Sequence, residues 1–383
     1  MRVVLGQVPM PISDKTKLRL WVLAGGRCQY RGCNEPLWRD DRTQADMNAA
    51  YIAHIIADSP DGPRGDPALS PQLASELSNL MLLCDVDHRR IDREFRSVHD
   101  APILREMKRE HEARIETVTG ISPDLGSHVL LYGANIGDHA SKLGYEDAAR
   151  AIVPKRYPAD SKPIRLDMID SGTTDRDAAF WKQEEDNLVS KFGTRVRQVV
   201  ADGTVRHLSV FARAPQPLLI RLGTLLTDIA PSDVFQLHRE PNAGWAWPLA
   251  SAPVPEFRFV KAPLDAKGPA ALVVSLSATV TSERIASVLG TDCALWRVEL
   301  PSPRHDCISS PEHLSTLRAL LRQALDQVKA RHGGAEPLHI FPAAPVSTMV
   351  ELGRIRQPKA DMPWRIYDEN RARGGFVHVM DIG

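Results

Sequence analysis

The spacing of apolar positions changes near residue 120, which predicts two parts of different architecture. In the first part, short apolar segments alternate with loops rich in proline and glycine. We expect a helix over residues 15–25, a strand over residues 49–56, and a charged helix over residues 103–118 that ends near Gly120. The domain boundary is therefore expected between residues 120 and 135.

In the second part, strand-like and helix-like segments alternate. Residues 207–211, 271–280 and 338–341 are expected to be strands, and a long amphipathic helix begins after Ser310 and ends before Gly333. This alternation is typical of α/β units with largely parallel sheets.

The second part also contains an internal repeat. When residues 210–215 are placed over residues 340–345, a shift of 130 residues, Gly223 falls on Gly353 without any gap. Such a match indicates a duplicated α/β unit, although chance similarity between two α/β units would give the same pattern. A duplicated unit favours a cleft between two similar sheets, with a ligand beyond the carboxyl ends of these strands.

Composition narrows the classes of function. The 383-residue chain has a formal net charge of zero, which argues against a protein that coats nucleic acid with its whole surface. A basic stretch over residues 87–114 could still meet a phosphate backbone, or be a solvated helix face. No apolar run is long enough to span a bilayer, and the first residues lack the long apolar core and cleavage site of a secretory signal. With five cysteines, an odd number, we expect a cytoplasmic protein without a disulfide framework.

Three of the cysteines define a candidate zinc site. Cys28 and Cys33 flank a tight turn, and Cys84 lies close to Asp87 and His88 in the sequence. A structural zinc ion has four ligands, so the three thiolates need one more from the second cluster. Asp87 stands where the second sulfur of a Cys-x-x-Cys pair would be, and His88 is the competing choice. Cysteines that are only small buried side chains remain the alternative.

A second pattern contains histidine and asparagine. His54 ends a predicted strand, Asn79 precedes Cys84, and His88 lies in the helix that follows. Together with the cysteines, this order resembles the HNH nucleases, whose ββα-metal core holds one divalent ion between a hairpin and a helix. The resemblance covers residues 28–92.

The resemblance implies roles in the hydrolysis of a DNA phosphodiester. His54 would act as general base, Asn79 would brace the loop that positions it, and His88 would hold a catalytic Mg²⁺ or a similar divalent cation. Two arginines are candidates to hold the flanking phosphates, Arg64 and Arg89.

The chain departs from the HNH pattern in two places. Many HNH nucleases carry a metal ligand directly before the general base, where this chain has Ala53. Another acid is then expected in the shell of the catalytic metal, and Asp92 and Asp58 are the candidates. The second departure is Asp87 at the position of a zinc-site cysteine, which leaves the fourth zinc ligand open.

The second part resembles the SAVED domain, a fusion of two CARF-like Rossmann units that binds cyclic oligonucleotides. The likeness rests on residues 207–212, 222–223, 244–248, 339–345, 352–354 and 364–368. The predicted fold is therefore an α+β ββα-metal domain at residues 1–122, a linker at residues 123–135, and an α/β SAVED domain at residues 136–383 with repeats at about 160–260 and 268–383.

This combination resembles the HNH–SAVED effector nucleases of bacterial cyclic-oligonucleotide-based antiphage signalling (CBASS). The resemblance implies that a cyclic di- or trinucleotide binds the SAVED cleft, that a homo-oligomer assembles (a dimer, and a tetramer on activation), and that double-stranded DNA is then degraded. Aromatic side chains can stack on bases and cationic ones can hold phosphates. The candidate ligand-binding residues are Trp181, Arg213, Trp245, Trp247, Lys261, Pro345, Arg354, Trp364, Arg365 and Tyr367.

Most of these tryptophans could equally belong to the core. Trp245 and Trp247 are preferred as a ligand-binding pair, because Gly244, Pro248 and small residues around them favour an exposed loop. Two other functions also fit the sequence. In the first, the HNH domain is the nuclease of a restriction-type enzyme and the second part binds the target DNA. The lack of a basic stripe after residue 130 counts against this function. Alternatively, the protein could be a non-catalytic, nucleotide-responsive scaffold, an interpretation that Ala53 supports.

Overall fold

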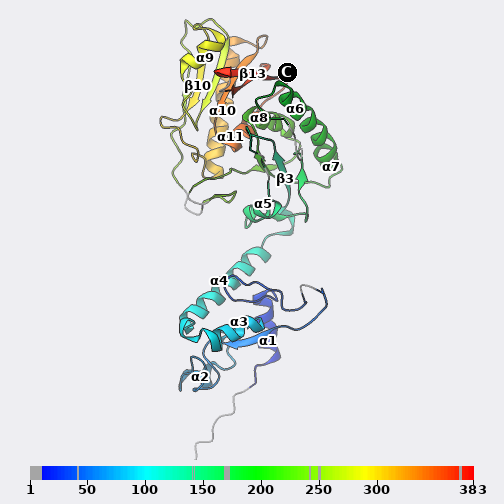
Figure 1. Ribbon diagram of the computed structural model, residues 1–383, viewed down its shortest axis with the longest axis vertical. Helices are drawn as coiled ribbons and strands as arrows, with labels where there is room; N and C mark the ends of the chain where they lie inside the picture. The colour runs from blue at the N-terminus through cyan, green and yellow to red at the C-terminus, as the bar shows by residue number, and fades with distance from the viewer. Residues whose placement is uncertain are drawn as a thin grey trace, which may run out of the picture. The chain divides into compact units, whose positions relative to one another are not determined.

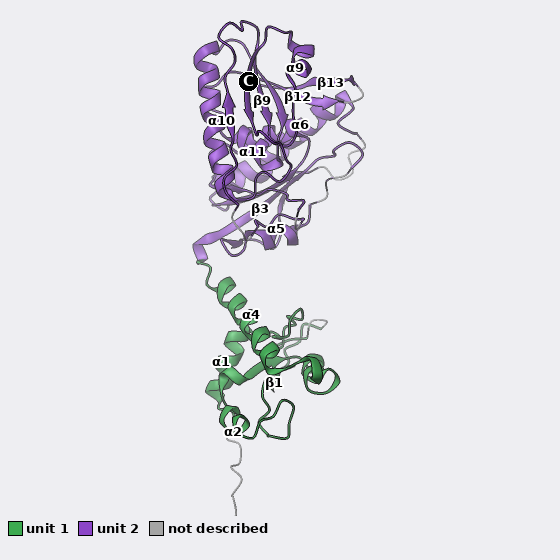
Figure 2. Ribbon diagram, turned by 90° about the vertical axis from the view of Figure 1, so that its left-hand side faces the viewer, with its two compact units in different colours: residues 1–122 green, residues 123–383 purple. Residues whose placement is uncertain are grey.

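The chain divides into two compact units, Met1–Ser122 and Pro123–Gly383, in the computed structural model (Figures 1 and 2). The structure describes residues 11–40, 43–139, 141, 143–167, 173–240, 243–248, 252–370 and 373–383. Each unit has a hydrophobic core of its own. Among the described residues, no helix is both long and apolar enough to cross a membrane.

The first unit is built around one antiparallel pair of strands. β1 (Tyr51–His54) pairs with β2 (Leu80–Leu83), so that His54 lies opposite Leu80. β2 is wholly buried, and only Cys84 separates it from the helical segment that follows. The helical elements of this unit are α1 (Asp14–Ala24), α2 (Leu69–Leu73), η1 (Leu77–Asn79), α3 (Asp85–Arg89), η2 (Arg90–Glu94), η3 (Arg96–Val98) and α4 (Ala101–Thr119).

The longer helices of the first unit begin and end where their capping residues lie. Ser13 accepts a hydrogen bond from the Thr16 amide at the start of α1, and Asp100 accepts one from the Ile103 amide at the start of α4. Gly25 ends α1 in the left-handed region at φ 60°. These two helices lie within one or two residues of their predicted positions.

The second unit contains two sheets whose central strands are parallel. One sheet has the order β4-β3-β6-β7, with β5 also paired to β3, and the other has the order β13-β12-β11-β9-β10-β8. The α/β character predicted for this part is therefore confirmed. The strands are β3 (Gly126–Gly133), β4 (Tyr157–Pro158), β5 (Ile164–Arg165), β6 (Leu208–Arg213), β7 (Ser232–Val234), β8 (Arg258–Val260), β9 (Ala270–Ser275), β10 (Ala294–Glu299), β11 (Leu338–Ala343), β12 (Trp364–Asn370) and β13 (Gly375–Ile382).

Helices cover the sheets of the second unit (Figure 1). The helical elements are η4 (Pro123–Leu125), α5 (Tyr145–Ile152), α6 (Ala178–Phe192), η5 (Gly193–Arg197), α7 (Gln198–Ala201), α8 (Gln216–Leu226), α9 (Ser282–Leu289), α10 (Pro311–His332) and α11 (Val346–Arg354). The two halves are equivalent around one strand–helix pair: β6 and α8 recur as β11 and α11, at an offset of 130 residues. β6 lies between β3 and β7 just as β11 lies between β9 and β12, and α8 packs against α11.

The predicted linker at residues 123–135 is wrong, and so is the start of the first repeat near residue 160. Residues 126–133 form β3, in which Val129, Leu130, Leu131 and Tyr132 are buried. This strand is apolar on both faces because it lies inside a parallel sheet, paired with β6 on one side and with β4 and β5 on the other. The first repeat therefore begins with β3, directly after the first unit.

Candidate functional site

Three thiols and one carboxylate converge at the start of α3. One ligand atom from each of Cys28, Cys33, Cys84 and Asp87 lies within 4.8 Å of the others. The sulfurs of Cys28 and Cys84 each lie 3.3 Å from Asp87 Oδ2. Tetrahedral zinc with bonds of about 2.0–2.3 Å holds its ligands roughly 3–4 Å apart, so this set fits a zinc ion.

The local backbone favours the anionic form of these sulfurs, and burial opposes it. The Cys84 amide donates to Cys28 Sγ and the Asp87 amide donates to Cys84 Sγ, both at 3.4 Å. Desolvation nevertheless raises the pKa of Cys84 to about 12 and raises the pKa of Cys28 and of Cys33 above the usual thiol range. Thiols in this position need a bound cation to become thiolates, which is what a zinc ion supplies.

Asp87, and not His88, completes the cysteine cluster. Asp87 Oδ2 faces the sulfurs, while Oδ1 accepts a hydrogen bond from Arg90. The His88 ring stacks on Tyr51 with the ring centroids 5.1 Å apart, and its Nε2 lies 3.3 Å from Asp92 Oδ2. Neighbouring residues of a helix point about 100° apart, so Asp87 and His88 serve different sites.

His54 ends β1 with its tautomer set by a backbone carbonyl. Its Nε2 lies 2.9 Å from the carbonyl oxygen of Ala74. A carbonyl oxygen can only accept a hydrogen bond, so Nε2 carries the hydrogen and Nδ1 keeps its lone pair. His54 thus has one nitrogen that can take a proton from a nearby water.

Asn79 joins the segments on either side of His54. Its side-chain oxygen accepts from the Ile56 amide at 2.9 Å, and its nitrogen donates to the carbonyls of Ile56 and Leu73 at 2.8 and 3.2 Å. Leu73 is the neighbour of Ala74, whose carbonyl holds His54. The buried Asn79 side chain therefore braces both the loop after His54 and the acceptor that fixes its tautomer.

The structure corrects the prediction that Arg64 holds a DNA phosphate. Its side chain is 8% exposed and forms an ion pair with Asp92 at 2.6 Å, so it is not free to bind a phosphate. Arg89 lies at the surface, half-exposed, in an ion pair with Asp85 at 2.7 Å that a phosphate could replace. Arg89 therefore remains a candidate for DNA contact.

His88 and Asp92 have a spacing that fits two ligands of one ion. The 3.3 Å between His88 Nε2 and Asp92 Oδ2 compares with about 3 Å for neighbouring ligands at bonds of roughly 2.1 Å. In the described part of the chain, the cysteine cluster is the only convergent group of three or more potential ligands. Ala53 is buried in the core and Asp58 is exposed. A second ion would therefore keep several waters, as Mg²⁺ commonly does.

A pocket of about 390 Å³ lies in the second unit, between β7 and the start of α10. Its apolar wall includes Pro154, Phe235, Trp247, Pro311 and Leu314. Charged side chains line the rest of it, namely Lys155, Asp233, Arg318, Glu351 and Arg354. A groove of about 450 Å³ adjoins the pocket and shares Ser315, Arg318 and Arg354 with it.

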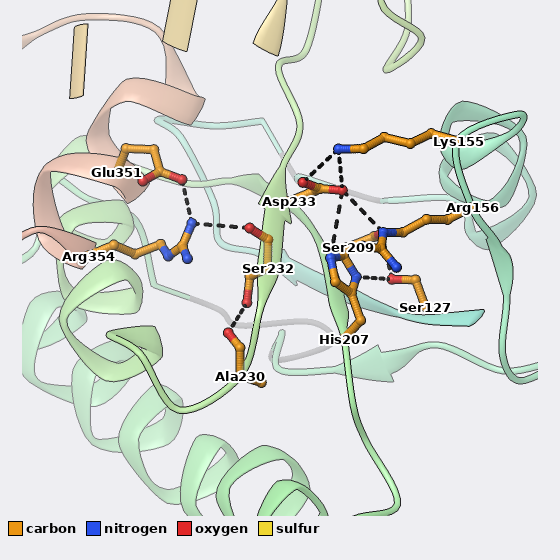
Figure 3. A network of polar contacts seen from close by, with 10 residues as sticks. All are labelled: Ser127, Lys155, Arg156, His207, Ser209, Ala230, Ser232, Asp233, Glu351 and Arg354. Atoms are coloured by element: carbon orange, nitrogen blue, oxygen red, sulfur yellow. Dashed lines mark hydrogen bonds and ion pairs between the residues drawn. The ribbon is translucent and has the colours of Figure 1, made fainter. Parts of the chain in front are cut away.

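A chain of polar contacts leads from this pocket to the start of β3 (Figure 3). Lys155 Nζ binds both carboxylate oxygens of Asp233 at 3.0 and 3.1 Å, and His207 Nε2 lies 3.7 Å from Asp233 Oδ2. His207 Nδ1 is hydrogen-bonded to Ser127 Oγ at 2.8 Å. Burial lowers the pKa of His207 to about 4. Ser127 is wholly buried, so this serine, histidine and aspartate form a structural network and not a hydrolytic triad.

On the opposite wall, two arginines share one carboxylate. Arg354 donates to Glu351 Oε1 at 2.6 Å and to the Ser232 carbonyl at 3.4 Å (Figure 3). Arg318 lies 3.4 Å from Glu351 Oε2. Arg354 Nε is buried without a hydrogen-bond acceptor among the described residues. The pocket thus holds three cations whose present partners are carboxylates, an arrangement in which an anionic ligand can replace a carboxylate.

Comparisons with known proteins identify the second unit. The model of the "SMODS-associated and fused to various effectors sensor domain", SAVED, matches residues 190–382. The chain belongs to the SAVED family. The match lies within the second unit, so the HNH nature of the first unit stays a prediction. No curated protein matches the chain.

Solved structures of SAVED/CARF-domain receptors also align with the chain. The Cap4 receptor of Acinetobacter baumannii with the cyclic trinucleotide 2′3′3′-cAAA is 13% identical, with a TM-score of 0.43 over 72% of this chain and 54% of that one. The same receptor with 3′3′3′-cAAA is also 13% identical, with a TM-score of 0.43 over 73% of this chain and 62% of that one. The Cap4 receptor of Moraxella osloensis is 13% identical, with a TM-score of 0.43 over 74% of this chain and 60% of that one. This chain spans less than two thirds of the length of each receptor.

Two of the predicted ligand residues, Trp247 and Arg354, line the SAVED pocket. The prediction that Trp245 and Trp247 form a ligand-binding pair is wrong for Trp245. Its side chain is buried and packs edge-on against Phe211, with the ring centroids 5.2 Å apart. Phe211 belongs to β6, and the residues next to Trp245 in the sequence give no sign of this contact.

The other predicted ligand residues lie away from the SAVED pocket. Trp364, Tyr367 and Pro345 are buried, and Trp364 and Tyr367 belong to the second sheet. Trp181 is buried against Phe180. The remaining three are Arg213 at the end of β6, Lys261 on the surface after β8, and Arg365 in an ion pair with Asp381.

Four charged residues of the SAVED pocket were not predicted from the sequence, namely Lys155, Asp233, Arg318 and Glu351. A basic pair after Pro154 was the only local signal for any of them. The others come from helices and a strand that are far apart in the sequence, so only the fold brings them together.

Proposed function

We propose that this protein is a metal-dependent DNA endonuclease that a cyclic oligonucleotide activates through the SAVED domain. The observation that carries the nuclease proposal is the tautomer of His54. Because Nε2 donates to Ala74, Nδ1 is left as a base at the end of a strand pair, next to a helical segment with His88 and Asp92. This is the arrangement expected for water-mediated phosphodiester hydrolysis in a ββα-metal site.

Each side chain of the first unit has a role in this proposal. His54 Nδ1 takes the proton of the attacking water, and Asn79 keeps His54 in place. A divalent ion, when held by His88 and Asp92, stabilises negative charge on the phosphate and on the leaving oxygen. The surface position of Arg89 suits a contact with a neighbouring phosphate. The cysteine cluster would hold structural zinc, which would fix the start of α3, the helix that carries His88.

The pocket of the SAVED domain supports the ligand class. A cyclic di- or trinucleotide presents flat bases and negatively charged phosphates. Trp247 and Phe235 offer apolar faces to bases, while Lys155, Arg318 and Arg354 offer charge to phosphates. In this proposal, phosphates replace Asp233 and Glu351 as the partners of these cations.

The test is cleavage of supercoiled plasmid by the full chain with Mg²⁺ and a panel of cyclic di- and trinucleotides, including 2′3′3′-cAAA and 3′3′3′-cAAA. His54→Ala is the inactive variant, and His305→Ala, an exposed histidine, is the matched control. We expect cleavage only with a ligand, lost in His54→Ala and kept in His305→Ala. Cleavage without any ligand would indicate a restriction-type enzyme. Ligand binding without cleavage would indicate a non-catalytic scaffold.

Assembly is a separate part of the proposal. We expect the activating ligand to convert the protein into a larger homo-oligomer, measured by light scattering on a sizing column. An unchanged mass with full activity would show that activation occurs within one particle.

A further inference from the structure

We infer that Arg64 is a positioning residue that sets the geometry of the candidate cleavage centre. It connects the end of β1, which carries His54, to η2, which carries Asp92. The inference rests on the proposed nuclease function, and it assigns to Arg64 a role different from binding DNA.

One guanidinium reaches acceptors on both segments. On the β1 side, Nε donates to the Ile55 carbonyl at 2.6 Å and one terminal nitrogen donates to the His54 carbonyl at 3.2 Å. On the η2 side, the other terminal nitrogen donates to the Ile91 carbonyl at 2.8 Å. Asp92 Oδ1 accepts at 2.6 Å from the nitrogen that also donates to His54. Only the planar fork of arginine offers donors in this many directions, since a lysine has a single nitrogen.

The backbone around Arg64 is tightly constrained. Arg64 has φ 56°, in the left-handed region that residues with a Cβ atom rarely adopt. A Cβ on Gly65 would lie 2.2 Å from the Pro60 carbonyl oxygen, and one on Gly62 would lie 2.5 Å from the Ala57 Cβ. Two glycines and an unfavourable arginine backbone conformation thus place this buried guanidinium.

The ion pair determines which oxygen of Asp92 faces His88. Arg64 occupies Oδ1, so Oδ2 remains 3.3 Å from His88 Nε2, on the side where the divalent ion is proposed. Without the guanidinium the carboxylate can rotate, and the end of β1 loses its link to η2. A displacement of this kind acts on the chemical step, because proton transfer and phosphate stabilisation depend on sub-ångström placement.

The kinetic test compares Arg64→Met and Arg64→Lys with Arg19→Met, an exposed arginine on α1, in the ligand-activated full chain. We expect kcat to fall about 100-fold for Arg64→Met and less for Arg64→Lys, with KM for DNA and its salt dependence within twofold of the parent values. A raised KM with unchanged kcat would overturn the inference and make Arg64 a phosphate contact.

Hydrogen–deuterium exchange tests the same link without using activity. In Arg64→Met, amides of residues 54–57 and 91–95 should both exchange faster, while Arg19→Met leaves them unchanged and zinc content is the same in both variants. Faster exchange in neither segment, or in only one, would overturn the inference even if the parent protein cleaves DNA. If the parent cleaves no DNA, the proposed function fails, and the exchange result still decides whether Arg64 couples the two segments.

Discussion

Gly223 in α8 and Gly353 in α11 lie in contact, and a Cβ atom on either glycine would come within 2.8 Å of the Cα of the other. The two residues occupy equivalent positions, 130 residues apart, in the two repeats of the SAVED domain. The equivalent helices of the two repeats, α8 and α11, therefore contact each other at equivalent glycines. This close approach explains why both copies need glycine at a position that lies inside a helix.

Alanine at either glycine is expected to destabilise the SAVED domain by about 3 kcal/mol. Its methyl group would lie 2.1 Å from the Val350 carbonyl oxygen in Gly223→Ala, and 2.0 Å from the Ile220 carbonyl oxygen in Gly353→Ala. Denaturant unfolding measures the effect. Gly193→Ala is the control, because a Cβ there would meet nothing within 4 Å, and its stability should stay close to that of the parent. Parent-like stability of Gly223→Ala would contradict the helix packing.

Zinc bound to the cysteine cluster should be lost when Cys33 is replaced by serine or Asp87 by alanine. Arg90→Met should weaken zinc binding about tenfold, because Arg90 holds the second oxygen of Asp87. Metal analysis and competition with a chelator give both results. Cys293→Ser, a cysteine outside the cluster, is the control. Full zinc content in Asp87→Ala would show that the fourth ligand is not Asp87.

Stability should fall as the pH is lowered from about 6.5 towards 4. Burial lowers the pKa of His207 and of His339 to about 4, whereas an unfolded histidine has a pKa near 6.5. In this window the unfolded chain binds protons that the folded chain does not, so each residue removes on the order of 3 kcal/mol by pH 4. Urea unfolding between pH 7.5 and 5 measures the slope.

The variants His207→Asn and His339→Asn should each flatten this pH dependence. Both side chains are buried and hydrogen-bonded, His207 to Ser127 and His339 to Tyr367, so stability at pH 7.5 is measured alongside. An unchanged slope in the double variant would assign the acid sensitivity to other groups.

Ligand affinity should depend on the pocket between β7 and α10. We expect Trp247→Ala and Arg354→Met to weaken binding of the activating cyclic nucleotide by tenfold or more, since stacking alone contributes about 1–3 kcal/mol per base. Calorimetric titration measures the affinity. Arg365→Met, in the surface ion pair with Asp381, is the control and should bind normally. Weaker binding in Arg365→Met, with normal binding in the other two variants, would indicate that the ligand binds at the second sheet.

The sequence predicts best the features that depend on neighbours along the chain. The long helix begins after Ser310, whose hydroxyl accepts from the His313 amide, and ends before Gly333, as its caps indicate. The spacing of the cysteines predicts that they converge, as they do, because thiols at such spacing have few other uses. The sequence leaves the choice between Asp87 and His88 open, because it depends on the direction in which α3 presents each side chain.

The errors concern features that only distant contacts decide. The sequence predicts a linker at β3 because its apolar run is short and follows a loop, whereas its burial comes from β6, 75 or more residues away. The small neighbours of Trp245 predict a surface position, although Phe211 packs against it. The prediction that Arg64 binds DNA is wrong because the sequence does not show which carbonyls surround a guanidinium.

The connection between the two units is very short. α4 ends at Thr119 and η4 begins at Pro123, so residues 120–122 are the whole connection, about 10 Å when extended. A tether this short keeps each unit at millimolar effective concentration relative to the other. A molecule that binds both units would therefore gain affinity from the tether without any additional contact.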